Sequence, residues 1–288
     1  MSAVFRHELS SYFSSVTGNV FGAFLLLFAG IYTMAICIQA GVANFEYVLS
    51  NMSFIFLIIV PILTMRVIAE ERRQKTDQLL YSLPLGMTRV VLGKYLAMLV
   101  VFAIPTAVIG LYPLILSLYG SVYLPAALGT LVGFFFLGAA LLSIGMFLSS
   151  LTESQAVAAG LCFVVMLLNY FVSSLAGYVS SSAFGSFAAF TVLVVLLALV
   201  IGRMTKNSFA AWLALVLLQS GLTGAYLLSE ERFEGAFPAV MEQLSPFDRF
   251  YQFVDGVFDV TALVYFLTVI GLFLFLTVQS MEKRRWSE

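Results

Sequence analysis

The residues of this chain that could do chemistry are few, and they form no catalytic or metal-binding pattern. His7 is the single histidine, so it cannot build a metal site by itself. Cys37 and Cys162 both lie in apolar segments and form no CxxC pair, which favours a role as small core residues. The chain has no GxxxxGKS or GxxxxGKT loop to hold nucleotide phosphates, and no HExxH or GxSxG motif. We therefore expect a protein that is not an enzyme and that binds no metal or cofactor itself.

The composition places the chain in a lipid bilayer. Of its 288 residues, 61% are hydrophobic and only 10% are charged, whereas a soluble domain carries roughly 25% charged residues. One crossing of a bilayer takes about 20 apolar residues. The charge-free stretches are long enough for eight crossings, and they cover residues 9–45, 47–65, 95–152, 154–202, 207–229 and 260–281. A water-soluble enzyme, a disordered chain and a nucleic-acid binder are excluded.

Turn residues at 119–121 and 177–182 divide the two longest stretches into two spans each. We predict an all-α polytopic membrane protein with one transmembrane domain over residues 1–288, and six spans is the alternative. With the N-terminus inside, 12 of the 14 basic residues face the cytoplasm. Both termini are therefore expected in the cytoplasm, with the chain in the plasma membrane. The eight predicted spans are 19–40, 48–68, 92–118, 124–149, 156–178, 184–202, 208–228 and 260–280.

The polar residues deep inside the predicted spans are uncharged. No charged residue lies deep in any of them, which argues against an ion-coupled carrier or a proton relay. Asn169 is the most central polar residue, and it could line a substrate path or simply bond to a neighbouring helix. Small residues are frequent, and their spacing indicates close contact between helices. They are Gly18 and Gly22 in the first span, and Gly129, Gly133, Gly138, Ser143 and Gly145 in the fourth.

Two segments on the predicted inner side carry information. Within residues 1–18, apolar side chains recur at helical spacing, which favours a helix in the inner membrane interface; a simple extension of the first span is the alternative. Residues 69–88 begin with charged helix formers and continue with Leu79 and Leu80, and Pro84 ends the predicted helix. This segment suits the docking of a soluble partner, whereas a merely solvated loop would not need the apolar pair.

The outer segment 229–259 contains a predicted amphipathic helix. Ser245 precedes Pro246, and Asp248 follows at the third helical position, which is a helix-start signal. The aromatic face suits an outer-surface helix that ends near Gly256 and could cap the mouth of a translocation path; an anchor for the last span is the alternative. The residues of that face are Phe247, Phe250, Tyr251, Val254 and Phe258.

Residues 66–95 resemble the cytoplasmic stretch of type-2 ABC exporter permeases, most closely the gliding-motility-like subfamily with its approximate pattern EE(K/R)RxGTxELLxxxPxxxxxxVLGK. Two further stretches agree with that family, 149–155 and 247–286. The sequence departs from the family at Lys75, where a glycine is usual, and at 184–228, which look like two additional spans. The matching positions are Glu70, Glu71, Arg72, Thr76, Leu79, Leu80, Pro84, Leu92, Gly93 and Lys94.

The resemblance implies a non-catalytic permease subunit of an ATP-driven exporter. Such a subunit works with a second copy of itself or a related permease, and with a separate P-loop ATPase subunit that binds ATP and Mg²⁺. Residues 1–18 would be the elbow helix, and Lys75 in place of glycine predicts a more continuous docking helix. An ion-gradient-driven secondary carrier is the alternative function. The predicted coupling residues are Glu70, Glu71, Arg72, Arg73, Thr76, Leu79, Leu80 and Pro84.

Overall fold

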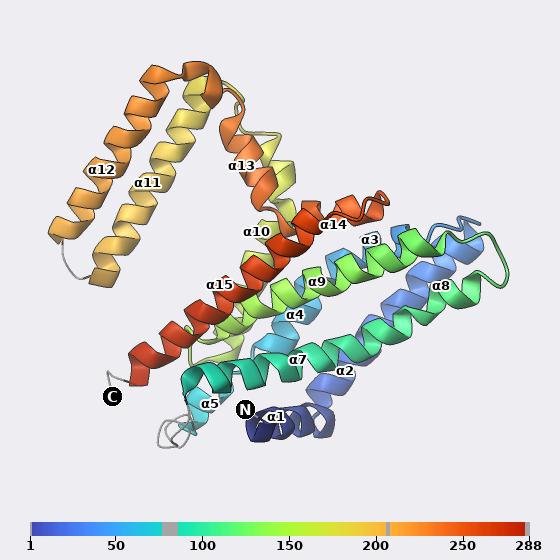
Figure 1. The fold of residues 1–288 in the computed structure, drawn as a ribbon. Coiled ribbons are helices and arrows are strands. Elements are labelled where there is room, and N and C mark those ends of the chain that lie inside the picture. Colours follow the sequence, from blue (N-terminus) through green and yellow to red (C-terminus); the bar gives the residue numbers. More distant parts are fainter. Residues whose placement is uncertain (1, 77–85, 206–207, 286–288) are drawn as a thin grey trace. The chain divides into compact units, whose positions relative to one another are not determined.

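The computed structural model of the chain describes residues 2–76, 86–205 and 208–285, and every regular element in these ranges is a helix (Figure 1). The all-α fold predicted from the composition is therefore confirmed. Because backbone groups find no water in a bilayer, helices that bond internally are the expected way for such an apolar chain to cross it.

Six helical stretches in the described residues are long and apolar enough to span a membrane, with 22 to 30 residues each. A seventh arises if Trp212–Leu228 and Glu230–Leu244, which are bent by 116° at their junction, form one span. The eight spans expected from the sequence thus stay a prediction. The six stretches are Val16–Gln39, Glu46–Gln74, Met87–Leu116, Leu124–Ser149, Gln155–Ala176 and Val260–Arg285.

The chain forms two compact units, residues 1–170 with 249–288, and residues 171–248. In the first unit, α9 packs against α3, α4, α7, α8 and α15 (Figure 1). The helices that lie wholly in this unit are α1 (Ser2–Ser14), α2 (Val16–Tyr32), η1 (Thr33–Gln39), α3 (Glu46–Met52), η2 (Ser53–Ile55), α4 (Phe56–Thr64), α5 (Ala69–Gln74), α7 (Met87–Ile109), α8 (Leu111–Leu116), α9 (Leu124–Ser149) and α15 (Val260–Arg285). Two helices, α10 (Gln155–Ala176) and α14 (Pro246–Val254), continue from one unit into the other.

Phenylalanine rings fill the centre of the first unit. The ring of Phe56 in α4 has its centroid 4.6 Å from that of Phe134 in α9 and 5.8 Å from that of Phe102 in α7. Phe250 of α14 adds an edge contact to Phe134, with the centroids 6.1 Å apart. All four side chains are buried. Aromatic pairs of this kind contribute roughly 0.5–1.5 kcal/mol each beyond the burial of their area, so they hold α4, α7 and α14 against α9.

Glycines of α9 make room for its neighbours. A Cβ atom at Gly138 would come within 2.4 Å of the Phe102 ring, and one at Gly145 within 2.5 Å of the Thr64 Oγ1 atom. The close contacts predicted for these two positions are confirmed. Gly22 of α2 differs, because nothing lies within 4 Å of the place where its Cβ would stand.

The second unit contains a helical hairpin with a cap at one end. Helices α11 (Ala183–Thr205) and α12 (Ser208–Leu228) pack against each other, and η3 (Glu230–Phe233) and α13 (Ala236–Leu244) pack against α11. The ring centroids of Phe190 and Phe237 are 5.2 Å apart, and those of Tyr226 and Phe233 are 5.4 Å apart. The Gly235 N–H donates to the Ser181 carbonyl at 2.8 Å. These contacts make the segment after α12 a folded cap rather than a loose loop.

Candidate functional site

The segment predicted to dock a partner begins with the short helix α5. Glu70 and Glu71 occupy its first turn and Arg72 and Arg73 its last, the arrangement that the helix dipole favours. The helix ends at Lys75, whose backbone is left-handed with φ 56° and ψ 22°. The expectation of a more continuous helix at Lys75 is therefore wrong.

The reason is the usual geometry of a helix end. A left-handed residue after the last turn lets its own N–H and the next one bond back to the final carbonyls. Here the Lys75 N–H donates to the Arg72 carbonyl at 3.1 Å, and the Thr76 N–H donates to the Glu71 carbonyl at 3.0 Å. Lysine thus adopts at this position the conformation that glycine adopts most easily.

The predicted coupling residues have different surroundings. Arg72 is buried, Glu70 and Glu71 are half-buried, and Arg73 and Thr76 are exposed. Leu79, Leu80 and Pro84 lie outside the described residues. The half-buried carboxylates of Glu70 and Glu71 contact the cationic side chains of Arg66 and Lys94, and these contacts define the candidate site.

Lys94, near the start of α7, is the centre of that site. Only 1% of the residue is exposed. Its Nζ atom donates to Glu8 Oε1 in α1 and to Glu71 Oε1 in α5, both at 2.6 Å, and to the Val67 carbonyl at 3.2 Å. A buried ammonium needs such partners because water no longer solvates it. One nitrogen therefore joins three helices that are far apart in the sequence.

Further polar contacts connect α1 and α5 to the neighbouring helices α2 and α4. Arg66 donates through Nε to Glu70 Oε2 at 2.5 Å and through Nη1 to Thr17 Oγ1 of α2 at 2.8 Å. The Tyr12 hydroxyl of α1 donates to the Leu63 carbonyl at 3.4 Å. Burial, with the nearby Glu8 carboxylate, raises the pKa of Tyr12 far above its ordinary value, so the hydroxyl stays neutral.

A pocket of about 560 Å³ opens beside these ion pairs. Its walls carry three carboxylates and two permanent cations, together with hydroxyl and amide groups. The described residues contain no group of three His, Cys, Asp or Glu side chains that could hold a metal ion. The lining residues are Ala3, Val4, His7, Glu8, Ser11, Tyr12, Ser15, Thr17, Arg66, Val67, Glu70, Glu71, Gln74, Thr76 and Lys94. Such a site can bind and orient charged groups.

The end of α9 supports α5 from another side. The Ser149 hydroxyl oxygen accepts from the N–H groups of Ile68 and Ala69 at 3.3 and 3.2 Å. Arg284 of α15 donates to the Glu153 carboxylate at 2.5 Å. This contact, with smaller effects of Arg72 and Lys75, holds the pKa of Glu153 below its usual range. Parts of the three stretches that carry the family resemblance thus come together at one end of the first unit: the start of α5, the residues around Ser149 and Glu153, and the end of α15.

Lys94, Glu8 and Ser149 were not among the predicted site residues. Lys94 belongs to the family-like pattern and Ser149 to the family-like stretch 149–155, but neither was assigned a role from the sequence. Glu8 is 86 residues from Lys94 and Glu71 is 23 residues from it. No local spacing rule connects these positions, so their meeting in one cluster could not be predicted.

The segment predicted to form an amphipathic helix contains α14, which begins at Pro246, directly after Ser245. The Asp248 N–H donates to the Ser245 hydroxyl oxygen at 3.2 Å, which is the expected N-cap bond. Phe247 and Phe250 are buried, as is Phe253, which the prediction omitted; Tyr251 and Val254 are half-buried. Phe258 lies beyond the helix and is 56% exposed.

Phe250 and Phe253 of α14 pack against α9 within the first unit. A Cβ at Gly133 of α9 would come within 2.7 Å of the Phe253 ring. The Thr130 hydroxyl of α9 donates to the Phe253 carbonyl at 2.8 Å. The apolar contacts of Phe250 and Phe253 are therefore made by α9, while the outer-surface position expected for the helix stays a prediction.

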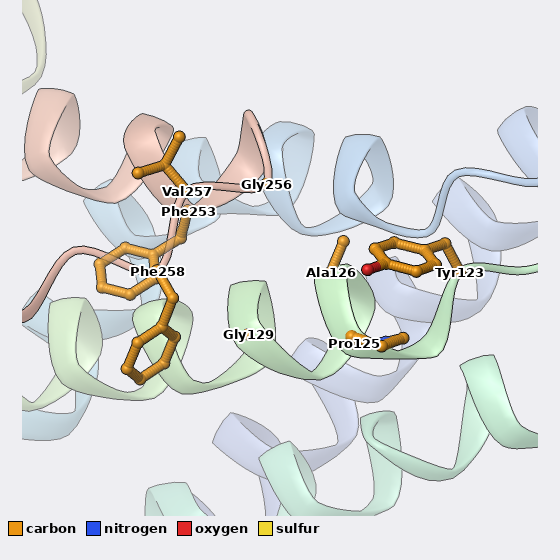
Figure 2. Close-up of a pocket in the computed structure, with 8 residues that line it drawn as sticks. All are labelled: Tyr123, Pro125, Ala126, Gly129, Phe253, Gly256, Val257 and Phe258. Atoms are coloured by element: carbon orange, nitrogen blue, oxygen red, sulfur yellow. The ribbon is translucent and has the colours of Figure 1, made fainter.

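Two small pockets lie near these outer elements. One, of about 150 Å³, lies between the start of α9 and the turn after α14 (Figure 2). The other, of about 280 Å³, lies between η1 and the residues after α8, and Cys37 lines it. Asn169 lines neither; it is half-buried and its amide donates to the Val165 carbonyl of its own helix at 2.9 Å. The structure therefore does not bring Asn169 together with the other predicted site residues.

Residues 38–182, half of the chain, match the family model described as ABC-2 family transporter protein. The matched region includes Glu71, Lys94 and Ser149, but Glu8 precedes it. A comparison with curated proteins gave no match. The six apolar helices agree with a multi-pass membrane subunit. This chain belongs to the ABC-2 family of transporter proteins.

Proposed function

We propose that the chain is the permease subunit of an ATP-binding-cassette exporter of the gliding-motility-like type. It moves a substrate across the plasma membrane with energy from ATP that a separate subunit hydrolyses. The chain itself is not the catalyst, and ATP and Mg²⁺ bind to the partner. The observation that carries this proposal is that parts of all three family-like stretches, through Ser149, Glu153 and Arg284, gather beside α5.

The docking surface in this proposal is α5 and the residues after it, 69–88. The exposed Arg73 and Thr76 belong to this surface, and Leu79 and Leu80 supply its apolar part. An aliphatic pair that fits a partner's pocket excludes water, so a charge placed there would remain poorly solvated in the complex.

The test is association with a coexpressed P-loop ATPase subunit of the ATP-binding-cassette type. Leu79→Glu together with Leu80→Glu should abolish copurification in mild detergent. The matched control is Leu227→Glu with Leu228→Glu, a second Leu-Leu pair that is 79% and 87% exposed at the end of α12. We expect the control to retain the ATPase. Unchanged recruitment by the Leu79/Leu80 variant would refute the docking assignment. Transport that persists without the ATPase and collapses with an ion gradient would favour the secondary carrier instead.

We also propose eight spans, both termini in the cytoplasm, and assembly with a second copy or a related permease. The support for the two extra spans is the length of α11 and α12, which have 23 and 21 residues and pack as a hairpin. At 1.5 Å per residue, each exceeds the roughly 30 Å thickness of the hydrocarbon core.

A further inference from the structure

At Lys94, α1, α5 and α7 share a charged contact. Glu8 and Glu71 both lie 2.6 Å from its Nζ atom, and the side-chain exposures are 1% for Lys94, 14% for Glu8 and 23% for Glu71. Two carboxylates held this close repel each other unless a cation lies between them. The ammonium therefore keeps α1 and α5 together, and neither helix can withdraw without leaving a buried charge short of a partner.

The position of the Lys94 contact determines which helices a displacement of the docking segment would reach. Glu71 is five residues before Thr76, at the entrance to the proposed docking segment. Glu8, the other carboxylate that accepts from Lys94, belongs to α1, which packs along α7 and α2. A displacement applied after α5 thus acts first on Glu71, and through Lys94 on α7 and α1 together.

We propose that Glu8, Glu71 and Lys94 make α1 a moving part of the coupling device, so that α1 follows α5 when the ATPase subunits close. Lys94 is a positioning residue in this scheme, and Glu8 transfers the displacement to α1. The proposal rests on the proposed function, because it requires a partner that pushes the segment after α5.

The test uses the full chain with its ATPase subunit in lipid nanodiscs. Spin labels at Ser10→Cys in α1 and Gln74→Cys in α5, in a Cys37→Ala/Cys162→Ala background, report the distance between the two helices. A second pair, at Gln74→Cys and Ser121→Cys, reports movement of α5 against the loop after α8. All three labelled positions are exposed. Distances are measured without nucleotide and after trapping with ATP and vanadate.

We expect the Gln74–Ser121 distance to shift on trapping while the Ser10–Gln74 distance keeps one narrow maximum. In Glu8→Gln, the Lys94–Glu71 ion pair remains and the complex should still assemble, but the Ser10–Gln74 maximum should broaden or shift on trapping. The matched control is Glu153→Gln, since Glu153 lies outside the docking surface 69–88 and bonds to Arg284 instead of Lys94.

The outcomes separate the two ideas. A Ser10–Gln74 distance that changes on trapping in the unmodified complex would overturn the inference alone, and so would Glu8→Gln behaving like Glu153→Gln. Absence of any complex with the ATPase, or of any shift in the Gln74–Ser121 distance, would overturn the proposed function and the inference with it.

Discussion

At Lys94, one ammonium group neutralises two carboxylates, and the number of charges decides what each substitution does. Removing the cation leaves Glu8 and Glu71 facing each other in a mostly buried place. Removing one acid leaves a balanced pair. The largest effect on stability is therefore expected at the lysine and not at either glutamate.

Lys94→Met should destabilise the purified chain by about 3–5 kcal/mol, the usual cost of leaving a buried charge without its partner. The measurement is the thermal midpoint of unfolding in detergent. Replacing all three residues, Lys94→Met with Glu8→Gln and Glu71→Gln, should recover most of the loss because no buried charge then remains. A triple variant that is as unstable as Lys94→Met would show that charge balance is not the cause.

Lys75 offers a second test at the same scale. A residue with a Cβ costs roughly 1–2 kcal/mol in the left-handed conformation, and glycine avoids that cost. Lys75→Gly should therefore raise the thermal midpoint slightly or leave it unchanged. Arg73→Gly, within α5, is the control and should lower the free energy of unfolding by about 1 kcal/mol, and with it the thermal midpoint. A Lys75→Gly variant that is less stable than Arg73→Gly would contradict the left-handed assignment.

At the scale of elements, the contacts of α9 depend on its missing side chains. A methyl group at Gly138 would overlap the Phe102 ring, and one at Gly145 would overlap Thr64. Overpacking of this kind costs about 1–3 kcal/mol. Gly138→Ala and Gly145→Ala should each lower the thermal midpoint, whereas Gly22→Ala, with open space around it, should not. Equal effects at all three positions would contradict the packing described for α9.

The elements also show how far sequence reasoning reaches. Charge-free length predicted the six apolar stretches, and turn chemistry predicted the start of α14 at Ser245. Periodicity indicated one buried face on α14, but the same pattern fits lipid and protein, so it could not identify α9 as the contact. The Glu8–Lys94–Glu71 cluster needs the tertiary fold, because its members come from three separate helices.

At the scale of the molecule, the first unit gathers the ends of several helices into one polar region. Residues 8, 71 and 94 meet there, and the Glu153–Arg284 pair connects the ends of α9 and α15. All these residues should therefore lie on the same face of the membrane.

Labelling with a membrane-impermeant maleimide checks this arrangement. Single cysteines at Ser10, Ser154 and Arg285, all exposed, should react in inside-out vesicles and stay protected in intact cells. A cysteine at Ser121, in the loop between α8 and α9, should show the opposite pattern. Reaction of the Ser154 and Arg285 variants from opposite sides would contradict the ion pair between Glu153 and Arg284.

The Glu153–Arg284 ion pair also limits how many times the chain can cross the membrane. A chain that leaves one face of a bilayer at Glu153 and touches the same residue again from Arg284 has crossed an even number of times in between. Helices α10 and α15 account for two crossings, so the stretch between them adds none or two. By this parity we expect the bent pair after Trp212 not to be a lone seventh crossing, and we predict that the protein crosses its membrane either six times or eight.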